Sequence, residues 1–215
     1  AIAAAYPGAA LLPYSAALAE HYTAAGDLAQ AATFRVQAAK LAQSQGALEA
    51  AALHCRAALQ ADKQTPLSPL CRIRALRILA QALFGLRRSD ECLAVYTEEY
   101  QDLKGGSLKG LARLVAAVVG EAVEQSRHLL SGGKGAAEPP SEPSRTLLRE
   151  QFFFTSLGVE LLVLRGRRLG PLRGLLRCLN LADASADNAL RAIASAGFAY
   201  ALTLLGQSRL AGRYA

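Results

Sequence analysis

The sequence predicts an all-α fold made of stacked antiparallel helix pairs. Alanine and leucine dominate a composition that is 52% hydrophobic and only 6% aromatic, and β-branched residues are few. This composition favours helices over strands. Apolar residues recur at steps of three and four along most of the chain, and turn signals separate these stretches about every 20 residues, as in helical repeat arrays. These observations predict an α-solenoid in which each helix pair buries its apolar face against the next.

The clearest helix pair lies at residues 18–39. Leu18 and Tyr22 fall on one face of its first helix. Gly26 is suited to ending that helix in a left-handed conformation, and Asp27 is suited to capping the next one. The second helix repeats the apolar pattern at Ala31, Phe34, Ala38 and Ala42.

The remaining helices follow from the same periodicity and from Gly, Pro and Ser at the turns. Helices are expected at residues 11–25, 27–45, 47–61, 70–86, 90–103, 107–130, 145–165 and 188–205, with a turn and helix at 165–178, a loop at 183–187 and a truncated helix at 209–215. The stretch 131–144 is rich in Gly, Pro and Ser and predicts a flexible linker. The predicted organisation is therefore a helical repeat domain at 1–130, the linker, and further repeats at 145–215. Because the chain contains no Met, we expect it to be a piece of a longer protein.

The net charge of +7 favours acidic partners, among them acidic proteins, nucleic acid and membrane surfaces. No aromatic and basic binding motif accompanies the charge, so a direct nucleic-acid role is not expected. The most apolar stretches, 108–119 and 152–164, are shorter than the ~20 residues that span a bilayer. They predict buried helices and no membrane span.

No catalytic, metal-binding or cofactor-binding residue is expected. The four cysteines are widely spaced within apolar helical patterns, as reduced core residues are. Zinc binding by His54 and Cys55 lacks further ligands at the usual spacing, because adjacent side chains on a helix diverge. The glycine-rich run 132–135 includes Lys134 but lacks the spacing and the preceding strand of a phosphate-binding loop.

Two clusters of side chains lie in the second half of the chain. Three consecutive aromatic residues at 152–154 cannot share one helix face, so at least one should meet a neighbouring helix or another part of the parent protein. Arginines at 165–178 have no acid among them and allow two interpretations, a solvated turn and helix face or a contact with an acidic partner. Arg167 and Arg168 are the candidate partner-binding residues.

The opening helix pair resembles a tetratricopeptide repeat (TPR). The matching positions are Leu18, Ala19 and Tyr22 in the first helix, Gly26 and Asp27 in the turn, and Ala31 and Ala38 in the second helix. Further matches begin near Leu76 and Phe198, although Arg87 replaces the usual turn glycine and Glu99 a later alanine. The resemblance implies a concave surface lined by first helices. On it, the implied partner-binding side chains are Glu20, Thr23, Arg77, Gln81 and Phe84, whose alternative is an ordinary solvated helix face.

Residues 18–59, 175–185 and 198–215 together resemble the helical tail of large signalling ATPases, in particular those fused to class III nucleotide cyclases, including the soluble adenylate cyclases. This resemblance implies a non-catalytic regulatory or docking scaffold that binds protein partners or other domains of its parent, in the cytoplasm and within a large cytoskeletal or signalling assembly. An alternative is a regulatory part of a multidomain adenylate or guanylate cyclase whose NTPase module lies outside this chain. A compact helical bundle with a small-molecule pocket is a third possibility.

Overall fold

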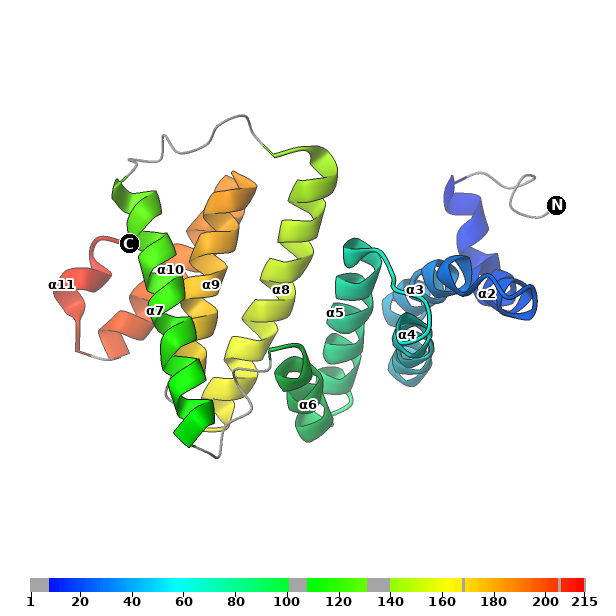
Figure 1. Ribbon diagram of the computed structural model, residues 1–215, viewed down its shortest axis with the longest axis horizontal. Coiled ribbons are helices and arrows are strands. Elements are labelled where there is room, and N and C mark those ends of the chain that lie inside the picture. Colours follow the sequence, from blue (N-terminus) through cyan, green and yellow to red (C-terminus); the bar gives the residue numbers. More distant parts are fainter. Residues whose placement is uncertain (1–7, 101–107, 131–139, 168, 205, 215) are drawn as a thin grey trace. The chain divides into compact units, whose positions relative to one another are not determined.

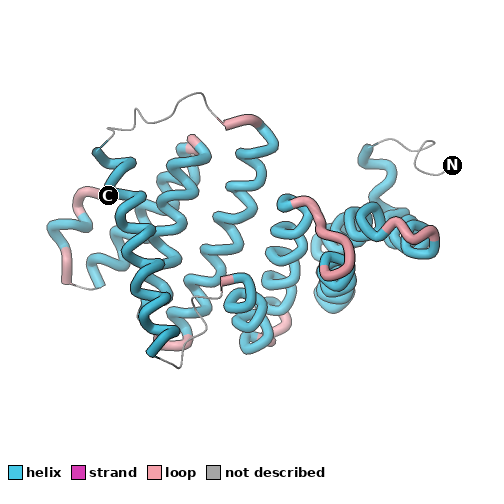
Figure 2. The backbone as a smooth tube through the Cα atoms, in the orientation of Figure 1, coloured by secondary structure: helices cyan, strands magenta, loops and turns pink. Residues whose placement is uncertain are grey.

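The computed structural model describes residues 8–100, 108–130, 140–167, 169–204 and 206–214, and every regular element within these ranges is a helix (Figures 1 and 2). The all-α prediction is confirmed. In chain order the elements are η1 (Gly8–Tyr14), α2 (Ser15–Ala24), α3 (Leu28–Ser44), α4 (Leu48–Asp62), α5 (Pro69–Gly85), α6 (Ser89–Glu99), α7 (Leu108–Leu130), α8 (Glu142–Leu164), α9 (Leu169–Ser185), α10 (Asn188–Leu204) and α11 (Ser208–Ala211).

The chain divides into two compact units, Ala1–Val95 and Tyr96–Ala215, so that the boundary falls within α6. The linker predicted from the sequence, 131–144, lies within the second of these units. Residues 131–139 lie outside the described residues, and Glu142 already begins α8. A proline in the first turn of α8 fits this early start, because proline there loses no helical hydrogen bond.

In unit 1, each helix from α2 to α5 packs against the next one, and α3 also contacts α5. The ring of Tyr22 stacks on Phe34 with the centroids 5.3 Å apart, which confirms the predicted pairing of α2 with α3. The core of this unit also contains buried aliphatic side chains such as Ile78 and Leu83, together with many small ones. Fully buried alanines occur at positions 32, 39, 51, 52, 58, 75 and 82.

A single turn geometry recurs between the helices. Gly26 has a left-handed backbone with φ of +78°. The amide of Asp27 donates to the carbonyl of Tyr22 at 3.0 Å, and the amide of Gly26 donates to the carbonyl of Thr23 at 3.1 Å. This is the Schellman arrangement that satisfies the last carbonyls of a helix. The same two bonds and a positive φ occur at Gly46, Arg87, Gly166 and Gly206.

In the turn at Gly26 and Asp27, Asp27 also caps the following helix, α3, as predicted. The Asp27 carboxylate accepts a hydrogen bond from the amide of Gln30 at 3.0 Å. That bond satisfies one of the free amides at the start of α3. In two turns the residue at positive φ is not glycine: Arg87 has a φ of +61° and Ala186 a φ of +53°, where a Cβ is disfavoured.

Unit 2 is organised around α9, which packs against α7, α8 and α10. Figure 1 shows α9 between α7 and α8. The prediction of a loop at 183–187 is wrong, because α9 continues to Ser185 and the turn follows at Ala186. Local sequence suggested a break there. Instead, burial of Ala182 and Ser185 and the contacts of Asp183 with neighbouring helices hold the last turn of α9.

The aromatic cluster of unit 2 fills the space between α8 and α9. Phe152 and Phe154 are buried and Phe153 is partly exposed, which confirms that the three rings do not share one face. Tyr96 is buried beside Phe154, with ring centroids 5.5 Å apart. Its ring lies directly on Gly158, where an added Cβ would overlap it. Glycine at this position therefore allows Tyr96 to enter the core.

Gly158→Ala should consequently destabilise the protein by about 2–4 kcal/mol, since the Tyr96 ring has no room to move in a packed core. The matched control is Gly197→Ala in α10, where a Cβ would make an ordinary contact, 3.7 Å from Leu175. There the better helix propensity of alanine should leave stability unchanged or slightly higher. Urea unfolding followed by circular dichroism compares the two variants. Equal stabilities would show that the space at Gly158 is not needed.

Candidate functional site

Unit 1 contains a groove where α2, α3 and α4 meet. Its volume is about 200 Å³, which is below the ~300–1,000 Å³ of typical small-molecule pockets. A groove of this size accommodates a side chain or a short peptide segment more readily than a metabolite. The lining residues are Thr23, Leu28, Ala31, Arg35, Ala57, Gln60, Ala61 and Gln64. We call this the α2–α4 groove.

Arg35 is the charged residue of the α2–α4 groove. Its guanidinium forms an ion pair with Glu20 at 3.1 Å and donates a hydrogen bond to the Thr23 hydroxyl at 3.3 Å. The Thr23 hydroxyl donates in turn to the carbonyl of Ala19 at 2.7 Å. Burial, followed by the nearby Arg35 cation, lowers the pKa of His54 on α4. His54 is therefore neutral at neutral pH, and the cationic group at this site is Arg35.

The other predicted TPR-type residues form a separate group on α5. Arg77 donates to the amide oxygen of Gln81 at 2.7 Å, and Gln43 of α3 donates to the same oxygen at 3.1 Å. Phe84 lies one turn further along α5 and is half-buried. The structure thus joins Glu20 and Thr23 through Arg35. It joins Arg77 and Gln81 with Gln43 in a second group.

Arg35 is a residue that the sequence interpretation missed. The sequence nevertheless contains a pattern that indicates Arg35. Across the turn at residues 26 and 27, Tyr22 of α2 stacks on Phe34 of α3, and the next charged residues on the side of this pair away from the turn are Glu20 and Arg35. Glu20 therefore faces Arg35, and the opposite charges identify the pair.

The arginines at 165–178 do not form one solvated face, so that interpretation is wrong for part of the segment. Arg173 is only 8% exposed, and its guanidinium lies 4.5 Å from the centroid of the Tyr100 ring. Arg177 pairs with Glu121 of α7 at 3.8 Å. Arg167 is exposed beside the turn at Gly166, whereas Arg168 lies outside the described residues. Arg167 therefore keeps the exposed setting expected of a partner-binding residue.

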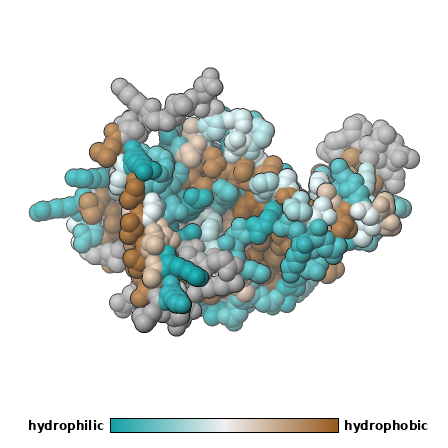
Figure 3. Space-filling view, viewed as in Figure 1, coloured by the Kyte–Doolittle hydropathy of each residue, from teal (hydrophilic) through white to brown (hydrophobic). Residues whose placement is uncertain are grey.

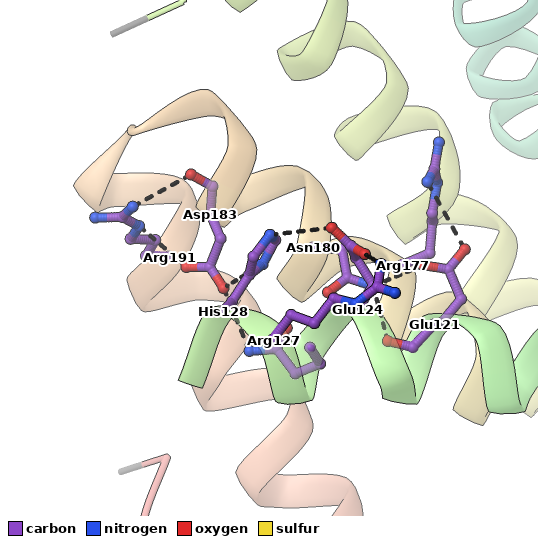
Figure 4. A network of polar contacts seen from close by, with 9 residues as sticks. Glu121, Glu124, Arg127, His128, Arg177, Asn180, Asp183 and Arg191 are labelled. Carbon is purple, nitrogen blue, oxygen red and sulfur yellow. Dashed lines mark hydrogen bonds and ion pairs between the residues drawn. The ribbon is translucent and has the colours of Figure 1, made fainter. Parts of the chain in front are cut away.

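A network of polar side chains connects α7, α9 and α10 (Figure 4). Asp183 is its centre. The carboxylate accepts a hydrogen bond from Gln125 at 3.3 Å, lies 3.4 Å from the imidazole of His128, and pairs with Arg191 at 3.2 Å. One turn away, Asn180 donates to the Glu121 carboxylate at 2.7 Å. These contacts join neighbouring helices, so the polar side chains of the network hold α7 and α10 on α9.

A second, larger hollow lies between the first turns of α8 and α10. Its volume is about 370 Å³. The charges around it are matched within the protein, because Arg145 lies 3.9 Å from Glu142 and Arg149 lies 3.4 Å from Asp187. The same Asp187 caps α10 by accepting from the amide of Ala189 at 2.9 Å. This hollow has no surplus charge to offer an ionic ligand.

The cysteine thiols of this protein lie in or beside its hydrophobic core. All four cysteines are free, and Cys55, Cys92 and Cys178 are buried. Burial raises the pKa of Cys55 and of Cys178 to about 12 and that of Cys92 to about 11. Burial also raises the pKa of the half-buried Cys71. A thiol is a nucleophile only as its thiolate, so these groups are poorly suited to covalent catalysis near neutral pH.

Metal-binding and membrane-spanning features are absent from the described residues. These residues hold no group of three or more His, Cys, Asp or Glu side chains placed to bind a metal ion. Within the same residues, no helix has the length and apolar character required to cross a membrane. Comparison of the chain with protein families, with curated proteins and with solved structures finds no match.

Asp183→Asn should lower the free energy of unfolding by about 1–2 kcal/mol, because the ion pair to Arg191 is lost at a partly buried site. Glu142→Gln is the control, since Glu142 is exposed and lies 3.9 Å from Arg145 on the surface of α8. Exposed pairs of this kind contribute at most about 1 kcal/mol. Guanidinium unfolding of both variants measures the difference. An unchanged stability of Asp183→Asn would mean that the network does not hold α7 and α10 in place.

The thiols should differ in their reaction with iodoacetamide at pH 8. We expect Cys71 to be alkylated first and the three buried cysteines to react only after unfolding, because few thiolates form below their raised pKa values. Mass spectrometry of peptides after timed labelling follows each residue. In urea the four rates should become similar, which controls for reagent bias. Rapid labelling of Cys55 or Cys178 in the folded protein would contradict this order.

Proposed function

We propose that the chain is a non-catalytic protein-interaction scaffold, built as a TPR-like α-solenoid, and that it serves as the helical-repeat tail of a larger signalling protein. The observation that carries this proposal is the α2–α4 groove. It contains Thr23, beside Glu20, and the TPR match assigns both residues to the partner-binding surface. The groove combines an apolar floor with a polar rim, as peptide-binding surfaces do.

The repeated geometry of the chain supports the solenoid. The same Schellman turn closes helices at Gly26, Gly46, Arg87, Gly166 and Gly206. Helices also contact their second neighbours, α3 with α5 in unit 1 and α7 with α9 in unit 2. Packing of this kind is expected when helix pairs stack in successive layers.

The chemistry of the groove favours a partner segment with an acidic or hydrogen-bonding side chain. Arg35 supplies a guanidinium, although Glu20 already occupies part of it. Gln60 and Gln64 add amides that both donate and accept hydrogen bonds. Leu28, Ala31, Ala57 and Ala61 offer the apolar contact. One side chain of an extended or helical peptide would fit between them.

The test uses peptides selected from a random library displayed against the whole chain. We expect Ala61→Arg, which fills the groove, to weaken the selected peptides by about tenfold or more, equivalent to about 1.4 kcal/mol. Ala192→Arg makes the same change at an exposed position of α10 and should leave the affinity unchanged. Fluorescence anisotropy measures the dissociation constants, and circular dichroism checks that both variants are folded.

Peptides that bind equally to both variants would exclude the α2–α4 groove as the binding site. Failure to select any binding peptide would count against an interaction scaffold as a whole. A selected peptide that responds to Ala61→Arg alone supports the proposal, because the two substitutions add the same charge and bulk.

A further inference from the structure

Helix α7 exposes a continuous apolar ridge. Leu111, Val115, Val119 and Val123 follow one another at intervals of four residues, and their exposed fractions are 50%, 44%, 55% and 48%. Residues spaced in this way lie on one helix face. Figure 3 shows the ridge as a brown stripe along α7. We call these four residues the α7 ridge.

The other face of α7 is already used. Val118 and Ala122 pack against the core of unit 2, together with α9. A helix that is apolar on two sides needs two apolar neighbours, and in the described residues α7 has only one covered side. The α7 ridge spans about 18 Å along the helix axis. This length corresponds to three to four turns of a partner helix.

The side chains next to the ridge allow a close approach. Ala112, Ala116 and Gly120 are exposed and run parallel to the ridge at the same spacing. No atom lies within 4 Å of a Cβ placed on Gly120. A row of large side chains beside a row of small ones forms the ridge and groove that a second helix fills. The shape of α7 therefore favours a helix as the occupant.

The charges beside the row of small residues favour an acidic occupant. Lys109 and Arg113 are exposed, one turn apart, and by helix geometry they border Ala112 and Ala116 on the side away from the ridge. Neither forms an ion pair within the described residues. On the second half, Glu124 is paired with Arg127 at 3.3 Å. The uncompensated charge along α7 is therefore positive, and a partner with carboxylates would complement it.

A second copy of the chain fits less well, because each copy carries a net charge of +7 and the two would repel each other. A membrane surface also fits less well. Helices that lie in a membrane interface insert large aromatic or leucine side chains, whereas the α7 ridge consists mainly of valine.

We propose that the α7 ridge is the docking site for an amphipathic partner helix whose apolar face is bordered by acidic side chains. This inference rests on the proposed scaffold function and names the class of partner for unit 2. The apolar contact provides the attraction, and Lys109 and Arg113 set the preference for carboxylates and the direction of the bound helix.

The experiment compares two synthetic peptide helices of about 18 residues, both with leucine at intervals of three and four. One carries glutamate at the borders of the apolar face and the other carries lysine. Fluorescence anisotropy with the whole chain at about 0.05 M NaCl should show binding of the glutamate peptide about tenfold or more tighter than the lysine peptide. The difference should shrink at about 1 M NaCl, where charges are screened beyond ~3 Å.

Three variants assign the binding to α7. Val119→Glu and Val115→Glu should each weaken the glutamate peptide by about tenfold or more, and Arg113→Glu should reduce the preference for glutamate over lysine. Ile193→Glu introduces the same charge at an exposed apolar position of α10 and should have no effect. Circular dichroism verifies the folding of each variant.

Equal affinity for the two peptides, or binding that is insensitive to both valine variants, would overturn the inference. Self-association in sedimentation that Val119→Glu abolishes would identify a second copy as the occupant, and binding to phosphatidylserine vesicles with the same sensitivity would identify a membrane; either result also overturns it. Peptide binding lost only in Ala61→Arg would refute the α7 ridge while leaving the scaffold function intact.

Discussion

Close packing of helices through very small side chains is the constraint on which the rest of this protein depends. Aromatic residues make up only 6% of the sequence, so few rings are available to fill the space between helices. In unit 1 the interfaces contain fully buried alanines such as Ala32, Ala52 and Ala82. At an alanine contact, apolar surface is removed from water only if the backbones lie close together.

Unit 2 satisfies the same constraint with glycine. The ring of Tyr96 occupies the space that a Cβ at Gly158 of α8 would need, and the side chain of Val159 occupies the space that a Cβ at Gly174 of α9 would need. Tyr96 also contacts the rings of Tyr100 and Phe154. One aromatic cluster therefore supplies much of the apolar contact that the small residues around it cannot provide.

Close packing also determines where polar groups lie. Because α9 is covered by helices on several sides, Asn180 and Arg173 are buried in spite of their polarity. The amide nitrogen of Asn180 donates to Glu121, and the Arg173 guanidinium lies over the Tyr100 ring. Buried polar groups of this kind fix the register of neighbouring helices, since a shifted register would leave them without partners. The two surfaces that we propose for binding, the α2–α4 groove and the α7 ridge, are faces that this packing leaves uncovered.

The sequence by itself determined the helical class, most helix bounds and the turns, because these depend on local interactions. Gly26 adopts the left-handed turn and Asp27 caps α3 as their positions predict. It also indicated Thr23 as part of a surface, and the structure places Thr23 in a groove. Only the tertiary structure decided that α7 packs on α9, that Arg173 is buried, and that the valines of α7 remain exposed. The periodicity of a helix shows that it has an apolar face, but the helix that covers this face is selected by shape and contact between segments far apart in the chain.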